Sequence, residues 1–383
     1  MKIVETFRSL PRQGVKRTVA TIRERLVAFL QKQRRKLPST REVIEFGIRP
    51  HRLRWMIKHV HGPHKVSYAG DELLVITVVR NGELHVESFM EHYLSLGVKH
   101  LVFLDNGSTD RTVEMLCAYD KVTVLRTDAP FAKYENTMKR YLVDRFSRGR
   151  WNLCADIDEL FDYPYSEVLS LRDFLGYLNH NRFTAVVTQM LDMFSDGPLG
   201  ELESSVDDRL TKKYVYYDIS VVRKTKDQLF DLSEASACDV MIHADGIRKT
   251  IFGTNNGLTK TALVFIDERV KTFVHWHLVR NALIADSTCV LKHYPFVSSF
   301  YAKVQDAATT GRYGNVTTDE YKAYWEVLKR NPNLSLKTAT ARRFTGLEQL
   351  IEEEFLVVSN KYRHWANAHA RGVQNTDEAL KGS

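Results

Sequence analysis

Cysteine is scarce in this chain, and its four cysteines lie far apart. Cys117, Cys154, Cys238 and Cys289 show no CxxC spacing, which favours free thiols in a reducing cytosol over a disulfide scaffold. The chain also lacks a run of about 18 uncharged apolar residues, so we expect no transmembrane helix. Its first residues carry charge throughout and show no apolar core of a signal peptide. We therefore expect a cytoplasmic protein.

Acidic residues are rare in the first part of the chain. Residues 1–69 hold 17 Lys and Arg against 4 Asp and Glu, a balance of +13, and the rest holds 38 against 43, a balance of −5. The 383 residues, 44% of them hydrophobic, are enough for one large folded domain or two ordinary ones. We predict a basic helical arm at 1–69, a globular domain at 70–360 and a partly disordered tail at 361–383.

The basic arm contains a segment with helical periodicity. Between Arg and Lys residues, apolar side chains recur every three or four positions, at Val15, Val19, Ile22, Leu26 and Phe29. This pattern is typical of an amphipathic helix with a basic polar face. Such a helix either packs on the rest of the protein or lies on an anionic membrane surface, here the inner face of the cell membrane. We expect no nucleic acid as a partner, because no recognisable reader motif accompanies the charge.

From residue 71 onward, predicted strands alternate with predicted helices. The strands are expected at 73–79, 100–105, 122–126 and 151–158, and helices at 83–97, after Ser108 and at 131–147. A further strand is expected at 183–194. The alternation is typical of a parallel sheet with crossover helices. In such sheets ligands bind beyond the carboxyl ends of the strands.

Polar residues gather where three of these strands end, at 79–83, 104–110 and 155–159. We expect these clusters to converge on one crevice. In the last of them Asp156 and Asp158 follow an apolar run, and buried carboxylates persist only when they are paired, protonated or bound to a cation. Oxygen ligands suit Mg²⁺ or Mn²⁺, which usually keeps positions open for substrate phosphates. The pattern therefore predicts a metal ion that holds a diphosphate.

At this point the sequence resembles a family. The stretches VITVVRNGELHVESFMEHYLSLGVKHLVFLDNGSTDRT and WNLCADIDELF are similar to bacterial family-2-type glycosyltransferases of the GT-A fold. The resemblance continues through 245–264 and 291–304 and covers about residues 72–358. The chain has Gly82 where many relatives have Glu, and Leu160 where Phe is usual.

The resemblance implies a GT-A fold, with a mainly parallel central sheet flanked by helices. It also implies a hexosyltransferase-like enzyme, which moves a sugar from a nucleoside diphosphate sugar to a hydroxyl group of a glycan or lipid-linked acceptor. Transfer would be metal-dependent and would invert the anomeric centre. Synthesis of a bacterial glycan or envelope polysaccharide would be the setting.

The resemblance assigns six residues to the donor, and one of them, Asp156, would lie near the ribose as well as the metal. Arg80 and Asn81 would border the nucleotide pocket, and Asp105 would accept hydrogen bonds from the base. Arg248 and Lys260 are cations fit to meet phosphate or an anionic acceptor.

For the metal ion, the resemblance points to three ligands or neighbours. Asp158 would bind the metal directly, and Asp156 would lie near the ribose and the metal. His293 matches a late histidine that approaches the metal or the diphosphate in many GT-A enzymes.

The acceptor hydroxyl needs a base, and a carboxylate would suit direct attack. Asp245 is our candidate, with Asp267 and Glu268 as alternatives. Two other functions stay open. A haloacid-dehalogenase-like phosphatase also has a DxD at a strand end, but on its first strand and with Thr or Val where this chain has Leu160. A non-catalytic nucleotide-sugar-binding or scaffold protein would use the basic arm as its working part.

Overall fold

The computed structural model describes residues 43–202, 209–226, 240–275 and 278–381. The chain divides into two compact units, Met1–Arg52 and Leu53–Ser383. In the first unit, the described residues form the π-helical segment η1 (Val43–Ile48) and the beginning of helix α4 (Arg49–Met56). The amphipathic helix predicted at 15–29 lies outside the described residues.

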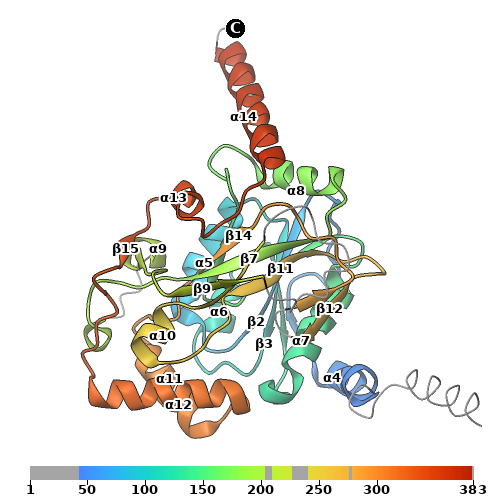
Figure 1. Cartoon of the computed structure of the whole chain (residues 1–383). Helices are drawn as coiled ribbons and strands as arrows, with labels where there is room; N and C mark the ends of the chain where they lie inside the picture. The colour runs from blue at the N-terminus through green and yellow to red at the C-terminus, as the bar shows by residue number, and fades with distance from the viewer. Residues whose placement is uncertain (1–42, 203–208, 227–239, 276–277, 382–383) are drawn as a thin grey trace, which may run out of the picture. The chain divides into compact units, whose positions relative to one another are not determined.

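Within the described part of the second unit, a nine-stranded mixed sheet has the order β1-β4-β3-β2-β5-β11-β7-β14-β6 (Figure 1). The strands are β1 (Lys58–His61), β2 (Leu73–Val79), β3 (His100–Asp105), β4 (Val122–Arg126), β5 (Trp151–Cys154), β6 (Glu159–Asp162), β7 (Ala185–Asp192), β11 (Thr259–Phe265) and β14 (Cys289–His293). Strands β2, β3, β4, β5, β7 and β14 run in one direction, and β1, β6 and β11 run in the other. The predicted α/β class with a mainly parallel sheet is confirmed.

Strand β2 shows why both faces of the sheet are covered. Its sequence LLVITVV is apolar at all but one position. Leu73, Val75 and Val79 belong to one hydrophobic cluster, whereas Leu74 and Ile76 belong to another. Because successive side chains of a strand point to opposite faces, a continuous apolar run is stable only when both faces are buried.

Helices lie on both faces. One face is covered by α5 (Glu83–Ser95), α6 (Thr112–Leu116), α8 (Leu171–His180), α9 (Leu210–Lys213), α13 (Leu347–Glu352) and the beginning of α14 (Asn360–Lys381). The other face is covered by α7 (Phe131–Phe146) and by the hairpin of β12 (Lys271–His275) and β13 (Leu278–Arg280). The remaining short elements are η2 (Leu199–Glu201), β8 (Tyr216–Tyr217), β9 (Val222–Thr225), β10 (Ile242–Asp245) and β15 (Arg342–Arg343).

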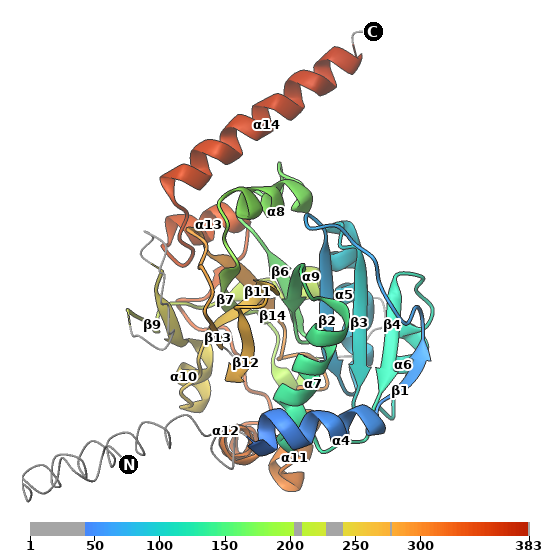
Figure 2. The ribbon, with the colours of Figure 1, turned by 90° about the vertical axis from the view of Figure 1, so that its right-hand side faces the viewer.

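A third hydrophobic cluster holds α10 (Ile247–Phe252), α11 (Phe300–Thr310) and α12 (Asn315–Arg330) together. Both ribbon views place α11 and α12 at the end of the sheet away from α8 (Figures 1 and 2). Helix α8 lies near the amino ends of β5 and β2, because Asn179 accepts a hydrogen bond from Trp151 Nε1 and donates one to the Gly70 carbonyl. Helices α11 and α12 therefore lie near the carboxyl ends.

Residues 53–69, which the sequence assigns to the basic arm, contribute to the second unit. Strand β1 pairs with β4, and Leu53 and Tyr68 are buried. At the other end of the chain, where the sequence predicts a partly disordered tail, α14 is helical as far as Lys381. None of the helices in the described ranges is long and apolar enough to span a membrane.

Candidate functional site

Polar side chains from six strands meet at one edge of the sheet. Parallel pairing aligns Val79 with Asp105 and Asp105 with Arg126, each at a carboxyl end. His293, at the end of β14, lies opposite Asp192 on β7 and Glu159 on β6. The antiparallel strand β11 begins at the same edge. The strand ends thus converge there, as the sequence pattern predicts.

The acidic motif itself departs from the prediction in one respect. The sequence predicts a strand over 151–158, but β5 ends at Cys154 and the next residues form a turn. Glu159 N–H donates to the Asp156 carbonyl over 2.9 Å and closes this turn. Asp156 and Asp158 therefore project from a turn, which allows them to point to different partners.

The loops after β2 and β3 form one hydrogen-bonded unit. Asn81, in the left-handed region at φ 52°, accepts a hydrogen bond from Thr109 N–H through its side-chain oxygen, at 2.9 Å. Arg80 Nη1 donates to the Asn106 carbonyl, also at 2.9 Å. The two residues predicted to border the nucleotide pocket thus hold the neighbouring loop in place.

Asp105 is fully buried at the base of these loops. Its Oδ1 accepts a hydrogen bond from Ser108 N–H at 3.0 Å, and its Oδ2 lies 3.4 Å from Arg126 Nε. A carboxylate has about four acceptor positions, and the contacts with Ser108 and Arg126 leave part of that capacity unused.

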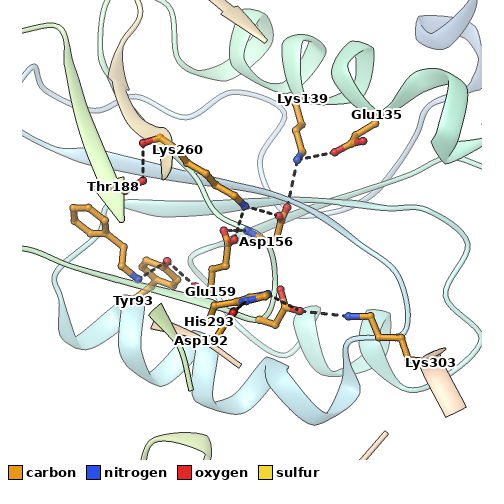
Figure 3. A network of polar contacts seen from close by, with 12 residues as sticks. Tyr93, Glu135, Lys139, Asp156, Glu159, Thr188, Asp192, Lys260, His293 and Lys303 are labelled. Atoms are coloured by element: carbon orange, nitrogen blue, oxygen red, sulfur yellow. Dashed lines mark hydrogen bonds and ion pairs between the residues drawn. The ribbon is translucent and has the colours of Figure 1, made fainter. Parts of the chain in front are cut away.

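Asp156 belongs to a group of charges that we call the lysine centre: Asp156, Glu159, Lys139 and Lys260 (Figure 3). Lys260 Nζ lies 3.1 Å from Asp156 Oδ2 and also contacts Glu159 Oε1. Lys139 Nζ lies 3.4 Å from Asp156 Oδ1. Burial would raise the pKa of Asp156, but Lys139 and Lys260 hold it well below its usual range. Both Asp156 oxygens therefore face ammonium groups.

Asp158 belongs to a second group, which we call the histidine centre: Asp158, Asp192, His293, Arg248 and Lys303. His293 Nδ1 lies 2.6 Å from Asp192 Oδ1, and its Nε2 lies 3.7 Å from Asp158 Oδ2. Arg248 Nε donates to Asp192 Oδ2 at 2.8 Å, and Lys303 Nζ lies 3.4 Å from Asp158 Oδ2. Burial would lower the pKa of His293, but Asp158 and Asp192 raise it to about 9.

The acidic side chains at this edge fit a metal ion only in part. In the described ranges, no three His, Cys, Asp or Glu side chains are arranged to hold one. Asp158 Oδ2 and His293 Nε2 nevertheless face each other, and a carboxylate on the far nitrogen, as Asp192 provides, is the usual way to orient a metal-bound histidine. Mg²⁺ often takes one or two protein ligands and completes its shell with phosphate oxygens and water. Of the three predicted metal residues, Asp158 and His293 face each other, whereas Asp156 is paired with lysines.

Asp245 lies outside both centres, two residues before the start of α10, which carries Arg248. Its backbone is in the left-handed region at φ 78°, which is strained for a residue with a side chain. Arg223 Nε donates to Oδ2 at 3.1 Å, and Oδ1 is buried without a hydrogen bond from a described residue. Of the alternative bases, Asp267 lies beyond the end of β11 at the opposite edge of the sheet, and Glu268 follows it.

Four residues of the two centres are absent from the sequence-based set: Glu159, Asp192, Lys303 and Lys139. Glu159 lies in the polar cluster at 155–159, but the resemblance gives it no role. Asp192 ends β7, but it lies inside the strand predicted at 183–194, so the sequence did not mark it as a strand end. Lys303 lies inside the stretch 291–304, but the resemblance singles out only His293 there. Lys139 is one buried lysine on an amphipathic helix, and the sequence offers no local signal for it.

No family model matches the chain, and no curated protein matches it. Among solved structures, a 4-diphosphocytidyl-2C-methyl-D-erythritol synthase matches 37% of this chain and 70% of its own, with 13% sequence identity and a TM-score of 0.21. At so low a TM-score the match supports neither a shared fold nor a shared activity.

Proposed function

We propose that the protein is a glycosyltransferase with a GT-A type arrangement. It would bind a nucleoside diphosphate sugar at the carboxyl edge of the sheet and transfer the sugar to a hydroxyl group of a glycan or lipid-linked acceptor. The observation that carries the proposal is the pairing of carboxylates, most of them buried, with cations in two adjacent centres at this edge. Such an array suits a ligand that is itself strongly anionic.

The donor would lie across both halves of the edge. Hydrogen bonds between the loops after β2 and β3 hold Arg80, Asn81 and Asp105 close together, and these residues would meet the nucleoside. Lys260 and Arg248 would meet the diphosphate. Negative charge builds on the diphosphate as it leaves, and fixed cations in a water-poor site stabilise that charge in the transition state.

A Mg²⁺ or Mn²⁺ ion, when bound, would act as a Lewis acid on the diphosphate. Asp158 and His293 would hold it, and Asp156 would act from the neighbouring lysine centre. For His293 to serve, Nε2 must be unprotonated, and Asp192 would then keep the remaining proton on Nδ1.

Asp245 would take the proton from the acceptor hydroxyl, and attack would occur directly at the sugar with inversion. Oδ1 is buried and accepts no hydrogen bond from a described residue. This and the strained backbone support the assignment, because strain of this kind often persists where a side chain must be held for function.

The test is donor turnover. Full-length protein is incubated with UDP-, GDP-, CMP- and dTDP-sugars, with Mn²⁺ or with EDTA, and release of free nucleotide is measured. We expect one nucleotide class to be hydrolysed slowly, with water as acceptor, and only with the metal. Metal-dependent binding without turnover would favour the non-catalytic alternative, and hydrolysis of simple phosphomonoesters alone would favour the phosphatase. No binding of any donor would overturn the proposal.

A further inference from the structure

The last turn of α4 carries a tryptophan that is almost fully exposed. Trp55 is 90% exposed, and its neighbours Met56 and Val60 are 39% and 43% exposed. Among the described residues of the second unit, the other large apolar side chains that are exposed are Val168 and Val221. Tryptophan has the largest apolar surface of the side chains, and clustered exposed apolar side chains mark interaction sites.

The segment that carries Trp55 is basic. Residues 53–70 contain no Asp or Glu, and Arg54, Lys58 and Lys65 are exposed. None of these three cations forms an ion pair with an acidic residue in the described ranges. We call the group Trp55, Met56, Val60, Arg54, Lys58 and Lys65 the Trp55 surface.

This surface is held by a rigid support. Leu53 is fully buried one turn of the helix away from Met56, and the Tyr68 hydroxyl donates to the Trp151 carbonyl at 3.2 Å. Between them, Gly62 has φ 78°, and a Cβ there would lie 2.0 Å from the Val122 carbonyl oxygen. The chain is therefore anchored on both sides of the exposed residues. Because these anchors are packed against the domain, Trp55 stays exposed to solvent.

We propose that the Trp55 surface binds an anionic lipid bilayer. Tryptophan prefers the boundary between headgroups and acyl chains, and lysine and arginine are attracted to anionic headgroups. An apolar centre with basic surroundings satisfies both preferences at once. This contact lies on described residues and is distinct from the helix predicted at 15–29.

Two parts of the protein could cover the Trp55 surface, namely its own residues 1–42 or a second copy of the chain, and charge repulsion argues against both. Residues 1–42 hold 12 Lys and Arg against 3 Asp and Glu, so this segment is basic like the surface. A second copy would present the same basic surface. An acidic protein or a nucleic acid would also meet the cations, and both are outcomes of the test.

The Trp55 surface lies at the same sheet edge as the candidate site. Strand β1 is antiparallel to β4, and its first residue Lys58 pairs with Arg126, the last residue of β4. Arg126 in turn lies 3.4 Å from Asp105. If the proposed function is correct, on which this consequence rests, a bound membrane would present a lipid-linked acceptor near the donor site.

The test uses the full-length protein and two kinds of vesicle, neutral phosphatidylcholine and a mixture with about one third phosphatidylglycerol. Co-sedimentation should require the anionic lipid and weaken as salt rises, because salt screens exposed charges. Trp55→Ala should weaken binding about five-fold or more. Val221→Ala removes an exposed apolar side chain elsewhere and serves as the matched control.

Fluorescence separates this surface from the basic arm. The emission of Trp55, taken as the difference between the native protein and Trp55→Ala, should shift to the blue with anionic vesicles and be quenched by brominated lipids. An unchanged difference spectrum would overturn the proposal even if the protein sediments, because the arm would then carry the binding. Displacement from vesicles by RNA or polyglutamate, with no blue shift, would overturn it in favour of an acidic macromolecule. Donor binding without vesicles tests the proposed function separately.

Discussion

Asp156 and Asp158 are two residues apart and identical in chemistry, yet the structure gives them different partners. Asp156 lies between two ammonium groups in the lysine centre, and Asp158 faces an imidazole and Lys303 in the histidine centre. The difference arises because β5 ends before the motif and the intervening turn separates the two side chains. The two carboxylates of a DxD motif therefore need not act together, and substitutions of Asp156 and Asp158 should affect turnover and stability differently.

The largest effect should follow Asp158→Asn. We expect turnover to fall on the order of 1000-fold, because the proposed metal would lose its carboxylate ligand and the leaving diphosphate its stabilisation. The metal-dependent part of donor binding should disappear, while circular dichroism and the unfolding midpoint show that the fold survives. Near-native turnover would contradict the assignment of Asp158 to the metal.

Lys260→Met tests the lysine centre. It would leave the buried carboxylate of Glu159 without its cation and the partly exposed Asp156 with Lys139 alone, so we expect a loss of about 3 kcal/mol in the free energy of unfolding. Donor binding should weaken with or without metal. Lys292→Met is the matched control, because Lys292 forms a partly buried ion pair with Asp162 that is not part of either centre. Donor binding that weakens equally in both variants would show that Lys260 acts only through stability.

Asp105→Ala should weaken binding of the free nucleoside about ten-fold, to a similar degree with and without metal, because Asp105 lies in neither centre. Asp110→Ala controls for damage to the loop, since Asp110 accepts hydrogen bonds from the N–H groups of Thr112 and Glu83. Affinity for the nucleoside that is unchanged in Asp105→Ala, or reduced equally in the control, would argue that Asp105 only shapes its loop.

The smallest effect concerns a histidine at the amino edge. Burial lowers the pKa of His100 to about 4, so between about pH 6.5 and 4 the unfolded state binds a proton that the folded state does not. Stability should therefore fall as the pH drops through this window, by on the order of 1 kcal/mol for this residue. Denaturant titrations of His100→Gln should show a shallower pH dependence than those of the exposed control His180→Gln. Equal slopes would show that His100 is not neutral in the folded protein.

Local sequence patterns predict one half of the sheet well. The strands expected at 73–79, 100–105 and 122–126 have the observed bounds, because each is a mostly apolar run between turn signals. Strand β6 is missed, since its four residues follow the acidic turn directly and take their position from pairing with β14, far along the chain. Antiparallel insertion of β11 between β5 and β7 is likewise a long-range pairing without a local signal.

The candidate site likewise contains residues that local sequence predicts and residues that only long-range packing brings in. Asp105, Asp156 and Asp158 stand at strand ends, where the sequence marks them. Lys139 and Lys303 come from helices whose approach to the sheet depends on packing, and the sequence does not show which lysine of a helix faces inward.

The most direct test of the account is a crystal of the protein with Mn²⁺ and a nucleoside diphosphate, measured at the manganese absorption edge. We predict an anomalous peak about 2.1 Å from Asp158 and from His293 Nε2, with the diphosphate reaching toward Lys260 and the nucleoside toward Asp105. A peak bound to Asp156 in place of its lysines, or a nucleotide bound away from this edge of the sheet, would contradict the account.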